Sequence, residues 1–192
     1  MRELIERYVR ELVKIPSTSN TETEKSCADY IAEELAKQPY FKEYPEQTGK
    51  YLLPEDSFGR SVPWGLVKGR NGSRKTIILT GHYDVVDTEE YGNERALAYD
   101  VEKWENLVKS GNVLPGMPDE VKEDFLSGDW MFGRGTADMK GGLSVGLALL
   151  DWYGKLVVEA ERKECGTAAF ETKTASGTEE TPEISGNLLF VT

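Results

Sequence analysis

A short β-branched apolar run, Thr76–Thr80, constrains this chain most, because it leads directly into the sequence Gly81-His82-Tyr83-Asp84. Residues of this kind favour a buried strand. A strand that ends in His-x-Asp presents an imidazole and a carboxylate from a rigid position. Imidazole is a good metal ligand, and a carboxylate on its second ring nitrogen fixes the tautomer. The pattern therefore predicts that His82 is a metal ligand and that Asp84 orients it.

His82 is the only histidine among the 192 residues. One histidine does not make a zinc site, so its partner ligands must be carboxylates, cysteines or groups that this chain lacks. Cys27 and Cys165 lie far apart and fit no C-x-x-C pattern, which predicts reduced thiols and a cytoplasmic location.

The chain has 23 basic and 34 acidic residues and a net charge of −11. This balance argues against nucleic acid or an anionic membrane as the main partner, because phosphate binding needs a basic face. No apolar run approaches the ~20 residues needed to span a bilayer. Acidic residues interrupt the apolar start of the chain, which excludes a signal peptide.

Hydrophobic periodicity predicts the α/β class, with a mixed, mainly parallel sheet flanked by helices on both faces. The length suits a single domain over residues 1–192. A turn signal after residue 68 predicts that two of the strands form an antiparallel pair. The expected helices cover residues 3–14, 21–37, 100–110, 118–127 and 143–156, and the expected strands cover 61–68, 75–80 and 187–191.

The composition changes near the C-terminal end. Residues 158–185 contain few apolar side chains and predict a polar flexible segment. The apolar strand that follows ends one residue before Thr192. Functional groups in α/β sheets lie just past the carboxyl ends of strands. We therefore expect a truncated chain.

A second motif lies in the glycine-rich turn Gly133-Arg134-Gly135-Thr136-Ala137-Asp138-Met139-Lys140-Gly141-Gly142. Glycines permit positive φ and close backbone approach, so this turn is suited to hold Asp138 in a fixed direction. A carboxylate held in this way can bridge two metal ions ~3.5–4 Å apart. A phosphate-binding loop is the alternative, but the order Lys-Gly-Gly is not the Walker order Gly-Lys-Ser/Thr.

Two nearby groups receive simpler interpretations. Arg134 is suited to hold the Asp138 loop or a nearby carboxylate, and we favour a structural role for it. The acidic residues Asp87, Glu89 and Glu90 are typical of a solvated loop rather than of a metal site.

The His82 and Asp138 blocks resemble the two N-terminal signature blocks of the zinc-dependent aminoacylase/carboxypeptidase family, which includes acetylornithine deacetylase, succinyl-diaminopimelate desuccinylase and peptidase T. The sequences Glu90-Tyr91-Gly92 and Ser127–Phe132 look most like the arginine utilization (arginine degradation) branch. The resemblance covers residues 5–156 and 186–191. The spacing between His82 and Asp138, 138 − 82 = 56 residues, is longer than in typical members.

The resemblance implies metal-dependent hydrolysis of an amide bond in a short peptide or an N-acyl amino acid. His82 would bind one zinc ion, Asp138 would bridge two, and Asp84 would tune His82, with cobalt or manganese as substitutes. The peptide bond from Asp138 to Met139 would be cis.

In the family, a Glu-Glu pair follows the strand that matches residues 186–191 and supplies the general base and a further ligand. A lid domain, often an interface between two copies, completes the site. This chain contains neither. The resemblance therefore implies that residues 1–192 are the N-terminal part of a catalytic domain, and we expect the chain to be inactive alone. The competing interpretation is a non-catalytic α/β binding or interaction domain that retains the hydrolase fold.

Overall fold

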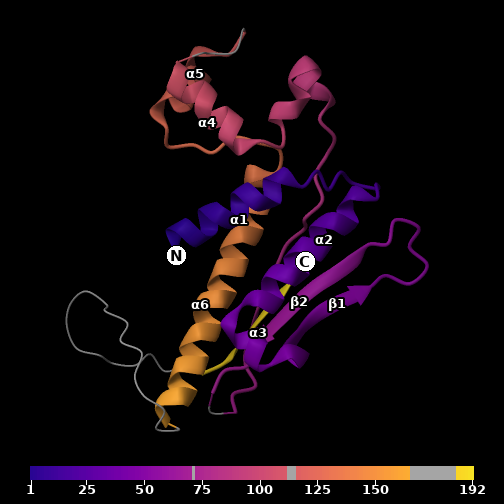
Figure 1. Cartoon of the computed structure of the whole chain (residues 1–192), viewed down its shortest axis with the longest axis vertical. Helices are drawn as coiled ribbons and strands as arrows, with labels where there is room; N and C mark the ends of the chain where they lie inside the picture. The colour runs from indigo at the N-terminus through magenta and orange to yellow at the C-terminus, as the bar shows by residue number, and fades with distance from the viewer. Residues whose placement is uncertain (71, 112–115, 165–184) are drawn as a thin grey trace, which may run out of the picture.

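The computed structural model describes residues 1–70, 72–111, 116–164 and 185–192 (Figure 1). In chain order the elements are α1 (Arg2–Lys14), α2 (Thr23–Lys37), α3 (Pro39–Glu43), η1 (Pro45–Gln47), β1 (Thr48–Leu52), β2 (Ser61–Val67), β3 (Thr76–Thr80), η2 (Glu89–Leu97), α4 (Val101–Ser110), α5 (Asp119–Ser127), η3 (Thr136–Lys140), α6 (Gly141–Glu164) and β4 (Asn187–Val191). None of the described helices is long and apolar enough to cross a membrane.

The strands form one sheet in the order β1-β2-β4-β3. β2 pairs antiparallel with both β1 and β4, and β3 pairs parallel with β4. The expected α/β fold, a mixed sheet flanked by helices, is confirmed. The expectation of a mainly parallel sheet is wrong for the described strands, because β3–β4 is their one parallel pairing.

The predicted antiparallel pairing of β2 with β3 is also wrong, because β4 lies between them. Phe190 of β4 is 1% exposed, whereas Ile77 and Ile78 of β3 are 67% and 59% exposed. The chain approaches the start of β4 closely here, because an added Cβ at Gly69 would come within 1.7 Å of the Gly186 carbonyl oxygen. The turn signal after β2 acts only locally, whereas burial of the distant apolar strand decides the pairing.

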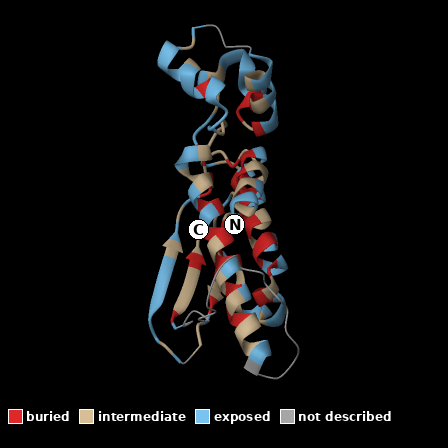
Figure 2. Cartoon of the chain, turned by 90° about the vertical axis from the view of Figure 1, so that its left-hand side faces the viewer, coloured by how far each residue is buried: buried red, intermediate tan, exposed pale blue. Residues whose placement is uncertain are grey.

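Helices α1, α2, α3 and α6 lie on one face of the sheet, and Figure 2 shows this arrangement in side view. The expectation of helices on both faces is therefore not met among the described residues. The long helix α6 comes between β3 and β4 in the chain sequence and packs against the face of the sheet. An added Cβ at Gly146 would lie 2.8 Å from the Phe190 ring, and one at Gly154 would lie 2.7 Å from Tyr40.

Helix α6 is longer at both ends than the periodicity predicts. Residues 158–164 were expected to begin the polar flexible segment, but they continue the helix to Glu164. The side chain of Val158 is 3% exposed and belongs to the main core. The rest of that predicted segment, residues 165–184, lies outside the described residues.

A separate lobe contains η2, α4 and α5, and Figure 1 shows it beyond one end of α1 and α6. The helices expected over 100–110 and 118–127 are confirmed as α4 and α5. Trp104, Phe125 and Leu97 form a small core of this lobe. Val101 joins it to α1 by packing against Val9 and Val13. The lobe connects the two sequence blocks that carry the candidate ligands.

The close contact between α6 and β4 predicts the effect of an added side chain. We expect Gly146→Val to lower the free energy of unfolding by about 1–3 kcal/mol, because the new methyl groups overlap the Phe190 ring. Denaturant unfolding followed by circular dichroism measures this. Trp152→Val is the control, because it introduces the same residue at an exposed position of α6. Equal effects of the two substitutions would contradict the packing argument.

Candidate metal centre

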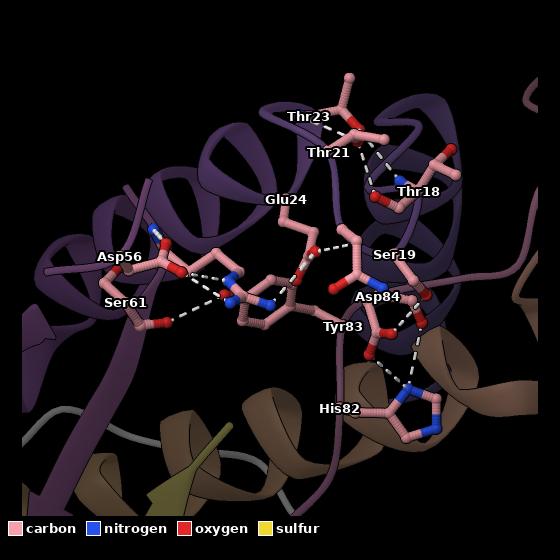
Figure 3. Close-up of polar contacts among 12 residues, drawn as sticks. Thr18, Ser19, Thr21, Thr23, Glu24, Asp56, Ser61, His82, Tyr83 and Asp84 are labelled. Atoms are coloured by element: carbon pink, nitrogen blue, oxygen red, sulfur yellow. Dashed lines mark hydrogen bonds and ion pairs between the residues drawn. The ribbon is translucent and has the colours of Figure 1, made fainter. Parts of the chain in front are cut away.

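His82 and Asp84 lie just past the carboxyl end of β3, in an extended segment held by the loop between α1 and α2. The backbone N–H of Val85 donates to the Ser17 carbonyl, and the N–H of Ser19 donates to the Val85 carbonyl, each at 2.9 Å. The Ser17 hydroxyl donates to the Tyr83 carbonyl at 2.6 Å. The Ser19 hydroxyl donates to Asp84 Oδ2, also at 2.6 Å (Figure 3). The Asp84 carboxylate is therefore held through Oδ2, which leaves Oδ1 to face His82.

The two ring nitrogens of His82 face different acceptors. Nδ1 lies 3.0 Å from the backbone carbonyl of Asp84 and 3.1 Å from its Oδ1, as Figure 3 shows. Nε2 lies 3.0 Å from Oδ1 of Asp138. Two oxygen acceptors at Nδ1 favour the tautomer with its proton there, which leaves the Nε2 lone pair directed at Asp138.

The structure brings Asp138 to His82 through the glycine-rich turn that the sequence singles out. Gly133 and Gly135 adopt positive φ values of 149° and 82°. The peptide bond between Asp138 and Met139 is cis, as the resemblance predicts. The Asp138 side chain is 87% exposed, and α6 begins three residues later. The carboxylate therefore stands clear of the surface, within reach of a metal ion.

Lys140 fixes this turn from below, a role that the sequence analysis missed. Its side chain is completely buried, and Nζ donates to the carbonyls of Leu12 at 2.9 Å and Ile15 at 2.5 Å. These carbonyls belong to the end of α1, where backbone acceptors lack helical partners. The pKa of Lys140 falls to about 8 because burial disfavours the ammonium, while the nearby Cys27 acts weakly in the opposite direction. The sequence feature that points to this role is a lysine inside a glycine-rich turn, a pattern that the sequence also shares with phosphate-binding loops.

His82, Asp84 and Asp138 line a pocket of about 280 Å³ together with Ser19, Arg134 and Thr136. Ser19 is a further residue that the sequence analysis did not select, because a serine in a polar turn carries no distinctive signal. A larger hollow of about 520 Å³ lies near Tyr40, Tyr44 and Lys68, where β2 ends. That hollow is at the opposite end of the sheet from His82 and contains none of the candidate ligands.

The charges around His82 raise its pKa above the ordinary value of 6.5. Partial burial lowers the pKa, but the Asp84 carbonyl and the Asp138 carboxylate together raise it by more. The ring is half exposed, with 50% of the side-chain surface accessible. A protonated ring would donate to both aspartates, whereas a metal ion would take the place of the proton at Nε2.

The donors present fit a divalent metal such as zinc in chemical type. Imidazole nitrogen and carboxylate oxygen are both common zinc ligands. Two such ligands ~2.1 Å from a tetrahedral ion lie ~3.4 Å apart, so the 3.0 Å pair of His82 and Asp138 needs only a small opening. No group of three or more histidine, cysteine, aspartate or glutamate side chains that could hold a metal occurs among the described residues. The described chain thus supplies part of a ligand set.

Comparisons with known proteins agree with this arrangement. No protein-family model matches the chain. The chain is 34% identical to "Protein RocB" of Bacillus subtilis (strain 168) over 148 residues, which are 77% of this chain and 25% of that protein. The chain thus spans about a quarter of the length of this curated relative. Its structure matches human carnosine dipeptidase 1 with a TM-score of 0.55 and 13% identity, covering 99% of this chain and 31% of that one.

The chain is similar to RocB in sequence and to carnosine dipeptidase 1 in fold. The resemblance to the aminoacylase/carboxypeptidase family is thereby confirmed in sequence similarity to RocB and in fold. A metallo-carboxypeptidase of the M20 family, Sso-CP2 from Sulfolobus solfataricus, matches with a TM-score of 0.48 and 18% identity, covering 97% of this chain and 30% of that one. This last likeness is too low to add to the argument.

Because the chain has a single histidine, His82 gives one imidazole signal in an NMR spectrum. We expect its titration midpoint to lie above 6.5, since Asp84 and Asp138 stabilise the charged ring. Asp138→Asn removes one of these charges and should lower the midpoint. Addition of zinc should abolish the titration, because the metal replaces the proton. A midpoint that Asp138→Asn leaves unchanged would show that the two side chains do not interact.

Lys140 gives a prediction for the pH dependence of stability. The unfolded chain releases this proton near 10.5 and the folded chain near 8. Between these values unfolding takes up a proton, so stability should rise with pH. The burial of Cys27, which raises its thiol pKa from 9.0 to about 11, opposes part of this rise near pH 9 and more of it at higher pH. We expect the free energy of unfolding to increase by up to about 1 kcal/mol between pH 8 and 9.

Denaturant unfolding at a series of pH values measures this increase. Lys140→Met is the matched variant, because methionine fills similar space without a titratable group. The variant should lack the rise between pH 8 and 9. Parallel curves for the two proteins would exclude Lys140 as its source.

Proposed function

We propose that this chain supplies the His82–Asp138 side of the metal centre of a metal-dependent amide hydrolase that acts on short peptides or N-acyl amino acids. The observation that carries the proposal is the arrangement of Asp84, His82 and Asp138, in which both nitrogens of one imidazole face carboxylate-bearing residues. The fold likeness to carnosine dipeptidase 1 supports the reaction class.

Each residue has a defined role in the proposal. His82 would hold a zinc ion through Nε2, and Asp138 would hold it through its carboxylate, which is 87% exposed and would also be open to a second ion. Asp84 holds the Nδ1 proton, and Ser19 holds Asp84 in place. This chain of contacts keeps the imidazole in the tautomer that a metal requires. When bound, the metal polarises the scissile carbonyl and lowers the pKa of a water molecule.

The described pocket contains no free general base. Asp84 and Asp138 are the only carboxylates among its described lining residues, and both face His82. General-base catalysis needs a further carboxylate or imidazole in reach of the water. The purified chain should therefore fail to hydrolyse a dipeptide or an N-acetyl amino acid, with or without zinc or cobalt. Metal-dependent turnover by this chain would refute the assignment of both aspartates.

Metal binding is the direct test of the proposed roles. We expect the chain to bind zinc weakly, and His82→Ala and Asp138→Ala to remove that binding. Asp84→Asn keeps the size of the side chain and should weaken zinc binding by about 10–100-fold, because it loses the charge that supports the ligand. Competition with a chromophoric chelator measures these affinities.

Asp87→Asn is a suitable control for the loss of one negative charge, because Asp87 is exposed and does not line the pocket. It should leave zinc affinity unchanged. A non-catalytic binding domain is the second candidate, since fewer than three clustered ligands occur among the described residues. Zinc affinity that is insensitive to His82→Ala would favour that candidate.

A further inference from the structure

Residues 86–132, called the insert below, separate the two segments that carry the candidate ligands. The insert begins directly after Val85, in the segment that follows β3, and ends just before Gly133, in the turn that leads into α6. Its described parts, residues 86–111 and 116–132, form the lobe with η2, α4 and α5 (Figure 1). The position of Asp138 relative to His82 therefore depends on how the two ends of the insert are joined.

Arg134 makes that junction, two residues past the end of the insert. Its guanidinium forms an ion pair with Glu90 through Nη2 and lies 5.3 Å from the centre of the Tyr91 ring. Its backbone N–H donates to the Ala98 carbonyl at 2.6 Å. The Arg134 side chain is 16% exposed, whereas Glu90 is 67% exposed, so only the guanidinium end of the ion pair is largely shielded from water. All three partners lie in the first part of the insert.

The segment around Arg134 has little freedom to move. An added Cβ at Gly133 would lie 2.9 Å from Val13 and 3.3 Å from the Ala98 oxygen. One at Gly135 would lie 2.8 Å from Val85, the residue next to Asp84. The turn is thus packed between the insert, the end of α1 and the His82 segment. A displacement of Arg134 would move the backbone that carries Asp138, four residues further on.

Asp138 itself has little else to hold it. Its carboxylate is 87% exposed, and among the described residues its side chain has one polar partner, His82. The direction of the carboxylate is therefore set by the turn rather than by neighbours of the side chain. Contacts that fix the turn therefore affect metal affinity even where they do not touch the candidate ligands.

We propose that Arg134 is a positioning residue that, through Glu90 and Tyr91, makes the placement of Asp138 depend on the folded insert. The inference rests on the proposed function of His82 and Asp138 as metal ligands. The insert then acts as a structural support of the metal site, in addition to any contact it makes with substrate. The competing explanation is that the Glu90–Arg134 pair only holds the insert to the rest of the fold.

A second ion pair provides the control that distinguishes these two explanations. Arg10 of α1 pairs with Glu105 of α4, and thus also holds the insert to the main body, but far from the Asp138 turn in the chain. Glu90→Ala and Glu105→Ala each remove one carboxylate from the insert and break one ion pair with a partly buried arginine. Glu105→Ala is therefore the matched control. Arg134→Leu removes the cationic partner of Glu90. Arg134→Lys keeps the positive charge without the planar guanidinium.

The readouts are zinc affinity, the visible absorption spectrum of bound Co²⁺, and the melting temperature of the metal-free chain. We expect Glu90→Ala and Arg134→Leu to weaken zinc binding by about 10-fold and to change the Co²⁺ spectrum, with Arg134→Lys intermediate. Glu105→Ala should match the wild type in both metal readouts. Equal losses of affinity in Glu90→Ala and Glu105→Ala, or wild-type metal binding in Arg134→Leu, would overturn the inference.

A metal-free measurement keeps this test separate from the proposed function. At pH 9 the ring signal of His82 reports its contact with Asp138 without a change of charge. Glu90→Ala should shift that signal in the same direction as Asp138→Asn, and Glu105→Ala should not. If the wild-type chain fails to bind zinc, the proposed function fails, while the His82 signal still decides whether Arg134 positions Asp138. An unshifted signal in Glu90→Ala would reject the positioning role.

Discussion

Close packing of α6 against the sheet is the constraint on which the site depends. Gly146 lets the Phe190 ring of β4 approach the helix backbone, and Gly154 does the same for Tyr40. At the start of the helix, the backbone of Gly81, directly after β3, lies against Met139 and Leu143. Because α6 begins at Gly141, this packing brings the turn that carries Asp138 to the strand end that carries His82. A bulkier helix would separate the two candidate ligands.

Around this contact, the structure uses backbone interactions to fix side chains that are themselves exposed. Ser17, Ser19 and Val85 join the α1–α2 loop to the segment after β3. Lys140 joins the Asp138 turn to the end of α1. His82 and Asp138 can therefore remain accessible to a metal ion while the segments that carry them stay fixed. Sites at strand ends typically have this arrangement, in which buried contacts fix the backbone and exposed side chains bind the ligand.

The electrostatic balance of the site favours a cation at His82. The same two carboxylate-bearing residues that raise the His82 pKa provide negative charge around Nε2 and Nδ1. A proton and a metal ion compete for Nε2, so protonation of His82 opposes metal binding. Arg134 also lines the pocket, but its guanidinium forms an ion pair with Glu90 and lies near the Tyr91 ring. Its charge is thus directed toward the insert.

The sequence by itself determined the two motifs, most helices and the residues that meet in the site. His82, Asp84 and Asp138 were selected from local patterns, because a strand end, a lone histidine and a glycine-rich turn are all visible within a few residues. Tertiary structure alone decided that β4 separates β2 from β3 and that α6 continues to Glu164. It also decided the roles of Ser19 and Lys140, whose partners lie 65 and more residues away in the chain. Short-range patterns fix which groups are available, whereas long-range burial fixes which of them touch, because the gain from covering an apolar strand is independent of its distance along the chain.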